Sequence, residues 1–131
     1  MVKNIAVFFS VCVMLFSSML VANEADVLLL MQQDLAELNN KEGLMLTVEY
    51  APGASSKAHK HDAHTFVYVL EGSVIMQVAG KEAVELSAGQ TFYESPKDIH
   101  VVSKNASDSQ KARFLVFSLK EKGSPVVISV Q

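Results

Sequence analysis

Four histidines are the side chains of this sequence best suited to bind a metal ion. His59, His61 and His64 fall within six residues, and His100 follows the turn-rich residues 95–98. Successive side chains on an extended strand alternate between its two faces, so the two rings of an H-x-H pair point the same way. His59 and His61 can therefore bind one ion together, and His100 is the candidate for a third ligand. Imidazole suits borderline metals, so the candidate ions are iron, zinc, nickel and copper.

His64 and two further residues near the histidines are candidates for catalysis. Tyr93 and Glu94 lie on the segment that leads to His100, and alternation allows only one of them to point toward the histidines. A buried Glu94 would serve as a general base or as a carboxylate for the ion, although glutamate at a strand end is more often solvated. His64 has two roles open to it, as a fourth ligand or as a group that acts on bound substrate.

The elements that must position these residues are short strands. From residue 44 onward, apolar and β-branched runs alternate with turns rich in glycine, proline, serine and asparagine. Strands are predicted over residues 44–50, 65–70, 74–79, 83–86, 91–94, 100–103, 112–119 and 126–130. About eight short strands with turns every 8–12 residues predict an all-β sandwich or barrel, and a jelly-roll β-barrel is the natural closure.

Residues 23–42 precede this barrel, and their structure is open between two alternatives. Residues 27–31 are a continuous apolar run that residues 34–38 could extend into an amphipathic helix. Alternatively, residues 27–31 form a buried edge strand followed by a loop. Because everything downstream is β, we expect the strand and the loop.

The N-terminus has the pattern of a cleavable signal peptide. A basic start at residues 1–4 precedes the apolar residues 5–20 and a small-residue site, which predicts cleavage after Ala22, or otherwise after Ala25. The predicted organisation is a signal peptide at 1–22, an N-terminal extension or edge strand at 23–42 and a β-barrel domain at 43–131. The protein would then be periplasmic or secreted.

The composition of the mature chain limits the classes of partner that we expect it to bind. Cleavage after Ala22 removes Cys12, the only cysteine, so neither a disulfide nor a thiol nucleophile would remain. It also removes one lysine and moves the formal charge from −3 to −4. A mildly acidic domain without a basic stripe predicts no binding to nucleic acid, and no membrane association after cleavage.

The glycine and histidine spacings resemble the two motifs of the cupin superfamily. Gly53, five residues, His59-x-His61, and then Gly72 is similar to the first motif, and Gly89 followed after ten residues by His100 is similar to the second. The resemblance spans roughly residues 44–119 and is greatest to small, single-domain, quercetin-dioxygenase-like members. It implies a jelly-roll β-barrel with a divalent metal near its centre, held by the histidines of both motifs and by a glutamate of the first.

That glutamate is missing from this chain. Counting back from Gly72 places Thr65 at its position, and His64 precedes it. A neutral hydroxyl is a poor ligand for a divalent ion, so three imidazoles would leave the ion its full charge and more open positions. The ligand set that the resemblance implies is therefore His59, His61 and His100, with His64 open as a fourth member.

Two functions follow from these observations. The first is an exported small metalloenzyme, dioxygenase-, isomerase- or lyase-like, that acts on a small molecule at a three-histidine site. The second is a non-catalytic periplasmic ligand-binding module in which the metal is structural, favoured by the lack of an evident acid/base pair around the histidines. A homodimer is expected in both cases, because the apolar residues 27–31 can supply a sheet edge for pairing.

Overall fold

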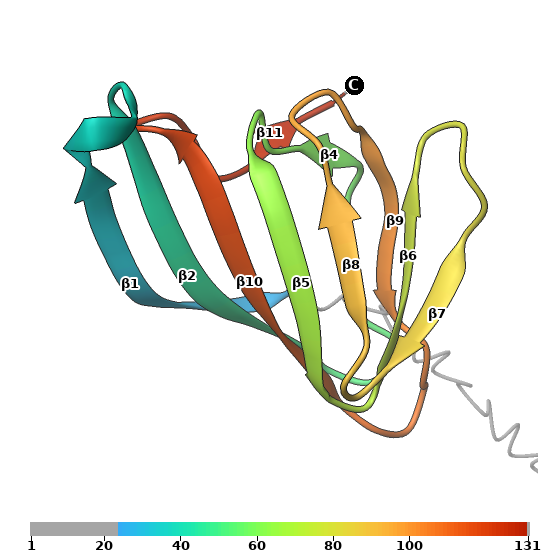
Figure 1. The fold of residues 1–131 in the computed structure, drawn as a ribbon. Helices are drawn as coiled ribbons and strands as arrows, with labels where there is room; N and C mark the ends of the chain where they lie inside the picture. The colour runs from blue at the N-terminus through green and yellow to red at the C-terminus, as the bar shows by residue number, and fades with distance from the viewer. Residues whose placement is uncertain (1–23, 131) are drawn as a thin grey trace, which may run out of the picture.

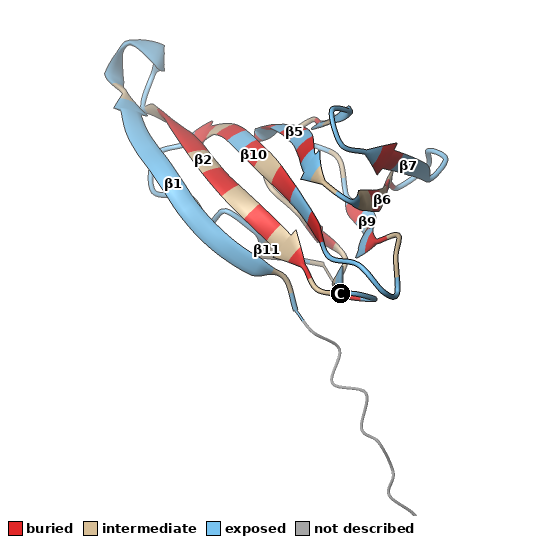
Figure 2. Cartoon of the chain, turned by 90° about the horizontal axis from the view of Figure 1, so that it is seen from below, coloured by how far each residue is buried: buried red, intermediate tan, exposed pale blue. Residues whose placement is uncertain are grey.

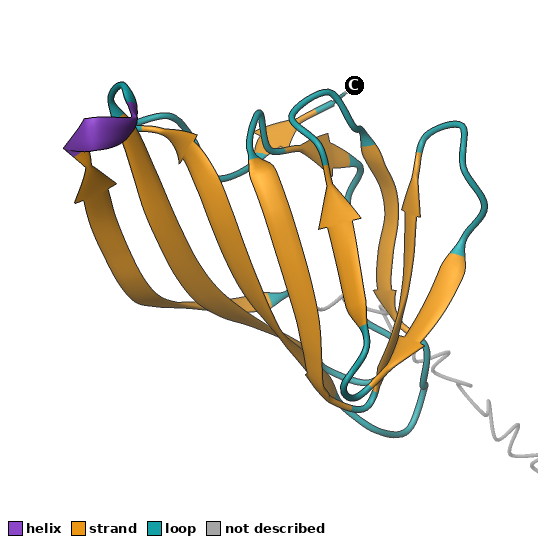
Figure 3. Cartoon of the chain, in the orientation of Figure 1, coloured by secondary structure: helices purple, strands orange, loops and turns teal. Residues whose placement is uncertain are grey.

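The structure, a computed structural model, describes residues 24–130, and nearly all of its regular structure is β-strand (Figure 1, Figure 3). Within this range no helix has the length and apolar character that crossing a membrane requires. The signal peptide predicted at residues 1–22 lies outside the described residues. The elements are β1 (Asp26–Leu35), η1 (Ala36–Leu38), β2 (Lys41–Tyr50), β3 (Ser55–Ser56), β4 (His59–Lys60), β5 (His64–Glu71), β6 (Ser73–Val78), β7 (Val84–Ser87), β8 (Thr91–Glu94), β9 (His100–Asn105), β10 (Ala112–Glu121) and β11 (Ile128–Ser129).

The strands form two antiparallel sheets that face each other. One sheet has the order β1-β2-β10-β5-β8, and the other has the order β11-β4-β9-β6-β7, with β3 paired to β9. Figure 1 shows the two layers converging below β5, β8 and β7 and separating toward β1. Strands far apart in sequence are therefore neighbours in the sheets. The prediction of an all-β fold is confirmed.

The core lies between the sheets and is built by alternation along each strand. On β2, Leu46 is buried whereas its neighbours in sequence are half-buried, and the register places it beside Val116 of β10. Val116 in turn lies beside Val67 of β5. Figure 2 shows this alternation as buried and more open bands on the same strands. Full burial of a side chain of this size stabilises a fold by about 1.5–3 kcal/mol, so such rows hold the two layers together.

The turn between β5 and β6 depends on Gly72. Its φ is +71°, and a Cβ added there would lie 2.5 Å from the carbonyl oxygen of Lys111 and 3.0 Å from Cα of Ala112. Glycine satisfies both requirements because it has no Cβ. The motif glycine at position 72 therefore allows β10 to pass close to this turn.

The strand predicted over residues 27–31 exists, but its burial was predicted wrongly. β1 is longer, pairs with β2 and is interrupted by a bulge between Leu29 and Met31. Side chains of this run are 48–61% exposed on both faces of the strand. The reason is its edge position, where the opposite sheet does not extend far enough to cover it (Figure 2).

A buried ion pair joins β2 and β10 near η1. Glu42 of β2 and Lys120 of β10 are both almost completely buried and contact each other directly. Gln32 donates a hydrogen bond of 2.7 Å to the other carboxylate oxygen, and Lys120 also donates to the carbonyl of Ser124 at 2.6 Å. The hydrogen bond from Lys120 is the main cause that lowers the pKa of Glu42, and the bond from Gln32 adds to it.

Candidate metal centre

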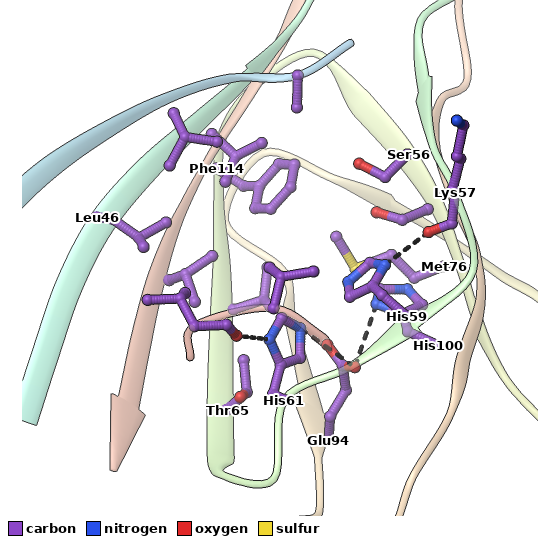
Figure 4. A pocket seen from close by; sticks show the side chains of 18 of the residues that line it. Leu46, Ser56, Lys57, His59, His61, Thr65, Met76, Glu94, His100 and Phe114 are labelled. Atoms are coloured by element: carbon purple, nitrogen blue, oxygen red, sulfur yellow. Dashed lines mark hydrogen bonds and ion pairs between the residues drawn. The ribbon is translucent and has the colours of Figure 1, made fainter. Parts of the chain in front are cut away.

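Three of the four histidines lie together at one end of the space between the sheets. His59 of β4 and His100 of β9 are direct partners across the two strands, and their ring centroids are 5.1 Å apart. His61 follows β4, and its ring lies 4.8 Å from that of His59. One nitrogen from each of the three rings falls within 4.8 Å of the others, so the group could hold a metal ion (Figure 4).

Two of these rings are oriented by backbone carbonyls. His59 Nδ1 lies 2.7 Å from the carbonyl oxygen of Lys57, and His61 Nδ1 lies 2.7 Å from that of Val126. A carbonyl only accepts, so each Nδ1 carries the proton and each Nε2 keeps a free lone pair. This is the outer-shell arrangement typical of metal-binding histidines.

Burial favours the neutral form of His59. Desolvation is the largest cause that lowers the pKa of His59, and the nearby rings of His61 and His100 act in the same direction. The hydrogen bond to Lys57 opposes the shift without reversing it. A neutral imidazole is the form that binds metal, so the fold presents His59 ready to coordinate at neutral pH.

Glu94 points into this centre. It is 2% exposed, and its Oε2 lies 3.1 Å from His100 Nδ1 and 3.8 Å from His61 Nε2. Among the described residues, the buried side-chain atoms without a hydrogen-bond partner are Glu94 Oε2 and both ring nitrogens of His100. Buried polar atoms are rarely left unpaired, so Glu94 Oε2 and His100 Nδ1, 3.1 Å apart, indicate a missing partner that both can contact. A divalent cation fits that donor set of imidazole and carboxylate.

The remaining sequence candidates lie on the other side of the sheet. His64 is exposed on the outer face of β5, and its Nδ1 is 2.7 Å from the hydroxyl of Tyr93. Tyr93 is 46% exposed on the same face. Alternation explains both positions, because Thr65 and Glu94, their neighbours in sequence, point inward. The structure therefore does not bring His64 or Tyr93 to the three-histidine group.

Thr65 stands at the position of the family's glutamate, but its hydroxyl is paired with another side chain. It is 1% exposed, and its hydroxyl is 3.3 Å from that of Ser118. Its direct partner across β5 and β8 is Glu94. β5 therefore lacks the carboxylate of the family motif, but the adjacent strand β8 has a carboxylate directly beside that position.

A cavity of about 620 Å³ opens from the histidines between the sheets. Its walls are mainly apolar, with Leu46, Val67 and Phe114 among them, whereas the histidines and Glu94 make one end polar (Figure 4). Tyr50 adds a second polar point, and its hydroxyl lies 2.8 Å from that of Ser103. Burial is the main cause that raises the pKa of Tyr50, so its phenol stays protonated at neutral pH. Such a cavity has the size and polarity of a small-molecule site.

The comparisons with known proteins agree with this architecture. The family model for the cupin domain matches residues 46–118, which is more than half of the chain. The chain therefore belongs to the cupin family, as the motif spacing predicted. The search of curated proteins found no match to this sequence.

Solved structures with the same fold include several enzymes. A predicted oxalate decarboxylase from Thermotoga maritima is 23% identical with a TM-score of 0.60, and the alignment covers 73% of this chain and 80% of that one. The polyketide cyclase RemF from Streptomyces resistomycificus is 23% identical with a TM-score of 0.60, over 84% and 73%. The DMSP lyase DddQ from Ruegeria pomeroyi is 16% identical with a TM-score of 0.57, and the match covers 63% of this chain and only 41% of the lyase. At these identities the similarity establishes the fold alone.

Proposed function

We propose that this protein is a metal-dependent enzyme, dioxygenase-, isomerase- or lyase-like, that acts on a small molecule. The observation that carries the proposal is the cluster of His59, His61 and His100, beside which buried atoms of Glu94 and His100 have no hydrogen-bond partner. A divalent transition ion held there, iron, zinc, nickel or copper, would supply Lewis-acid chemistry to a bound substrate. Structural neighbours that include a lyase, a cyclase and a predicted decarboxylase support a small-molecule reaction without choosing one.

The chain itself would bind and orient that substrate. The apolar walls of the cavity exclude water and favour an apolar portion of the molecule. The polar end, with the histidines and Glu94, favours an oxygen-bearing group beside the ion. A substrate of this kind would have one hydrophobic portion and one carboxylate, enol or carbonyl group.

The decisive experiment measures metal content and turnover together. Wild type, His61→Ala and His64→Ala are purified, stripped with a chelator, reloaded with each of the four ions and assayed by elemental analysis and against a panel of small oxygen-bearing acids and enols. His64→Ala is the matched control because this histidine lies on the outer face. Wild type and His64→Ala should take up about one equivalent, and His61→Ala should not. A wild-type protein that retains less than about a tenth of an equivalent of every ion would refute the proposal.

The second candidate is a periplasmic binding module with a structural metal. The mostly apolar lining of the cavity favours it, because such a lining can retain a ligand without any chemical step. Metal uptake with a large rise in Tm and no turnover across the panel would select this alternative. Metal-dependent turnover of any panel member would select the enzyme.

We also propose that the protein is a homodimer that pairs through β1. This strand lies at the edge of its sheet, so its outer edge has backbone groups free to pair, and its apolar side chains are exposed on both faces. A second copy along this edge would satisfy the backbone and cover both faces. Light scattering should give a dimer for wild type and a monomer for Leu28→Lys/Leu30→Lys, whereas Val101→Lys on β9 is the control. A monomeric wild type at tens of micromolar would contradict the proposal.

Export is the remaining part of the proposal and depends on residues 1–22 of the sequence. Cleavage would deliver the domain to the periplasm or the medium. Expression of the full chain in a bacterial host, followed by fractionation and intact-mass measurement, should give a mature form that begins at Asn23. An uncleaved chain in the cytoplasmic fraction would contradict export.

A further inference from the structure

We infer that Glu94 of β8 is a direct ligand of the ion and replaces the glutamate that the family motif places on β5. This inference rests on the proposed metal site and adds a fourth residue to it. The three-histidine group alone leaves Oε2 of Glu94 buried, without a hydrogen-bond partner and without a function.

The strand register explains how a carboxylate on β8 can reach the same site as a carboxylate on β5. Thr65 and Glu94 are direct partners across β5 and β8, and both point into the interior. Direct partners in an antiparallel pair have Cβ atoms about 4.5–5.5 Å apart, which a glutamate side chain can span. Glu94 can therefore bring its carboxylate to the region that a glutamate at position 65 would occupy.

The contact between Glu94 and His100 has the length of a hydrogen bond but not its alignment. Glu94 Oε2 lies 3.1 Å from His100 Nδ1, yet the two atoms are not aligned for a hydrogen bond. Two neighbouring ligand atoms that are each about 2.1 Å from one ion are about 3.0–3.4 Å from each other in octahedral or tetrahedral geometry. A close, misaligned contact of this length is what two ligands of a shared ion present.

The charge of the centre changes with this assignment. A buried carboxylate needs a cationic partner, because an isolated buried charge is strongly disfavoured. Among the described residues, His61 and His100 are the groups within 4 Å of the Glu94 carboxylate that can carry a positive charge, and they do so only when protonated; no lysine or arginine lies that close. A divalent ion would neutralise the carboxylate while the imidazoles stay neutral. A carboxylate oxygen also suits harder ions, so manganese becomes acceptable beside the borderline metals.

The test compares affinities for two ions in matched variants. Glu94→Gln keeps the shape of the side chain and removes its charge, and Glu85→Gln on β7 removes the same charge from an exposed position. Titration with Mn²⁺ and Zn²⁺ should show that Glu94→Gln loses more than about 100-fold in Mn²⁺ affinity, above the 10–100-fold that loss of an outer-shell partner costs. The loss for Zn²⁺ should be about tenfold smaller, because imidazoles suit zinc. Glu85→Gln should bind both ions as wild type does.

An exchange of the two residues provides a second measurement. Thr65→Glu/Glu94→Thr returns the carboxylate to the strand used by the family motif, and it should recover most of the Mn²⁺ affinity that Glu94→Gln loses. Circular dichroism checks that each variant is folded. Equal losses for both ions in Glu94→Gln, or affinities within threefold of wild type, would overturn the assignment while leaving the three-histidine site intact. A wild type that binds neither ion would overturn the site itself.

Discussion

The close approach of β10 to the turn at Gly72 allows a stability prediction with a built-in control. Replacing Gly72 by alanine places a Cβ at a residue with φ of +71°, 2.5 Å from a backbone oxygen. Gly80, in the turn after β6, has φ of +79°, and nothing lies within 4 Å of the added atom. In Gly80→Ala the free energy of unfolding therefore falls only because of the backbone conformation. In Gly72→Ala it falls because of the same conformation and because of a clash.

The two costs can be separated in magnitude. A left-handed conformation costs an L-residue about 1–2 kcal/mol, which is the whole effect expected for Gly80→Ala. Overpacking against atoms that cannot move freely adds about 1–3 kcal/mol, so Gly72→Ala should lose about 2–5 kcal/mol in the free energy of unfolding. In a domain near 100 residues, each kcal/mol shifts Tm by about 4–8 °C. The Tm of Gly72→Ala should therefore lie at least about 4 °C below that of Gly80→Ala.

Urea unfolding followed by far-ultraviolet circular dichroism measures this difference, because the chain has no tryptophan to report on folding. The slope of the transition must be equal in both variants for the free energies to be comparable. If the two variants are destabilised equally, the close contact between the turn at Gly72 and β10 does not constrain the fold, and the reasoning fails.

Three further predictions concern the ion, the C-terminal segment and the buried ion pair. Saturating zinc, at about 100 times its Kd, should stabilise wild type by about 2.7 kcal/mol and raise its Tm, and His100→Ala should show no shift in a thermal scan; an equal shift in both would place binding elsewhere. Deleting residues 126–131 removes the carbonyl that orients His61 and should lower zinc affinity by about 10–100-fold in a competition titration; unchanged affinity would exclude this orienting role. The pKa of Glu42 is lowered by its bond from Lys120, so its contribution to stability is complete above about pH 4.5 and is lost as pH falls through its folded pKa. Glu42→Gln should thus be less stable than wild type at pH 7 in urea unfolding, with a gap that narrows toward pH 3.5; a gap independent of pH would contradict this linkage.

Most of the strands and the pair His59 and His61 could be predicted from sequence because both depend on local spacing. Turn-rich segments on both sides located β8 at its observed bounds, and turn glycines separated most other strands. The H-x-H pair has a fixed geometry on an extended chain, so His59 and His61 were expected to converge. Their meeting with His100 followed from the resemblance to a known family, since nothing local relates residues so far apart.

The sequence raised a buried Glu94 as a carboxylate for the ion, but the pairing that places it there could not be predicted because it depends on strand register. Its relation to Thr65 is a pairing between β5 and β8 that no local pattern specifies. The carbonyl of Val126 that orients His61 was missed for the same reason, since a backbone group has no sequence signature. The exposure of β1 was missed because a continuous apolar run is equally consistent with a buried strand and with an uncovered edge.

The side chains around the candidate centre come from both layers of the fold, and this has a mechanical consequence. His59 and His100 extend from the six-stranded layer through β4 and β9, whereas Glu94 extends from the five-stranded layer through β8. A cation shared by all three would act as a cross-link between the layers at the end where β4 and β11 are only two residues long. Removing it would let that end open and close more often, so amide hydrogens of β4 and β8 would exchange faster while those of β2 and β10 kept their protection.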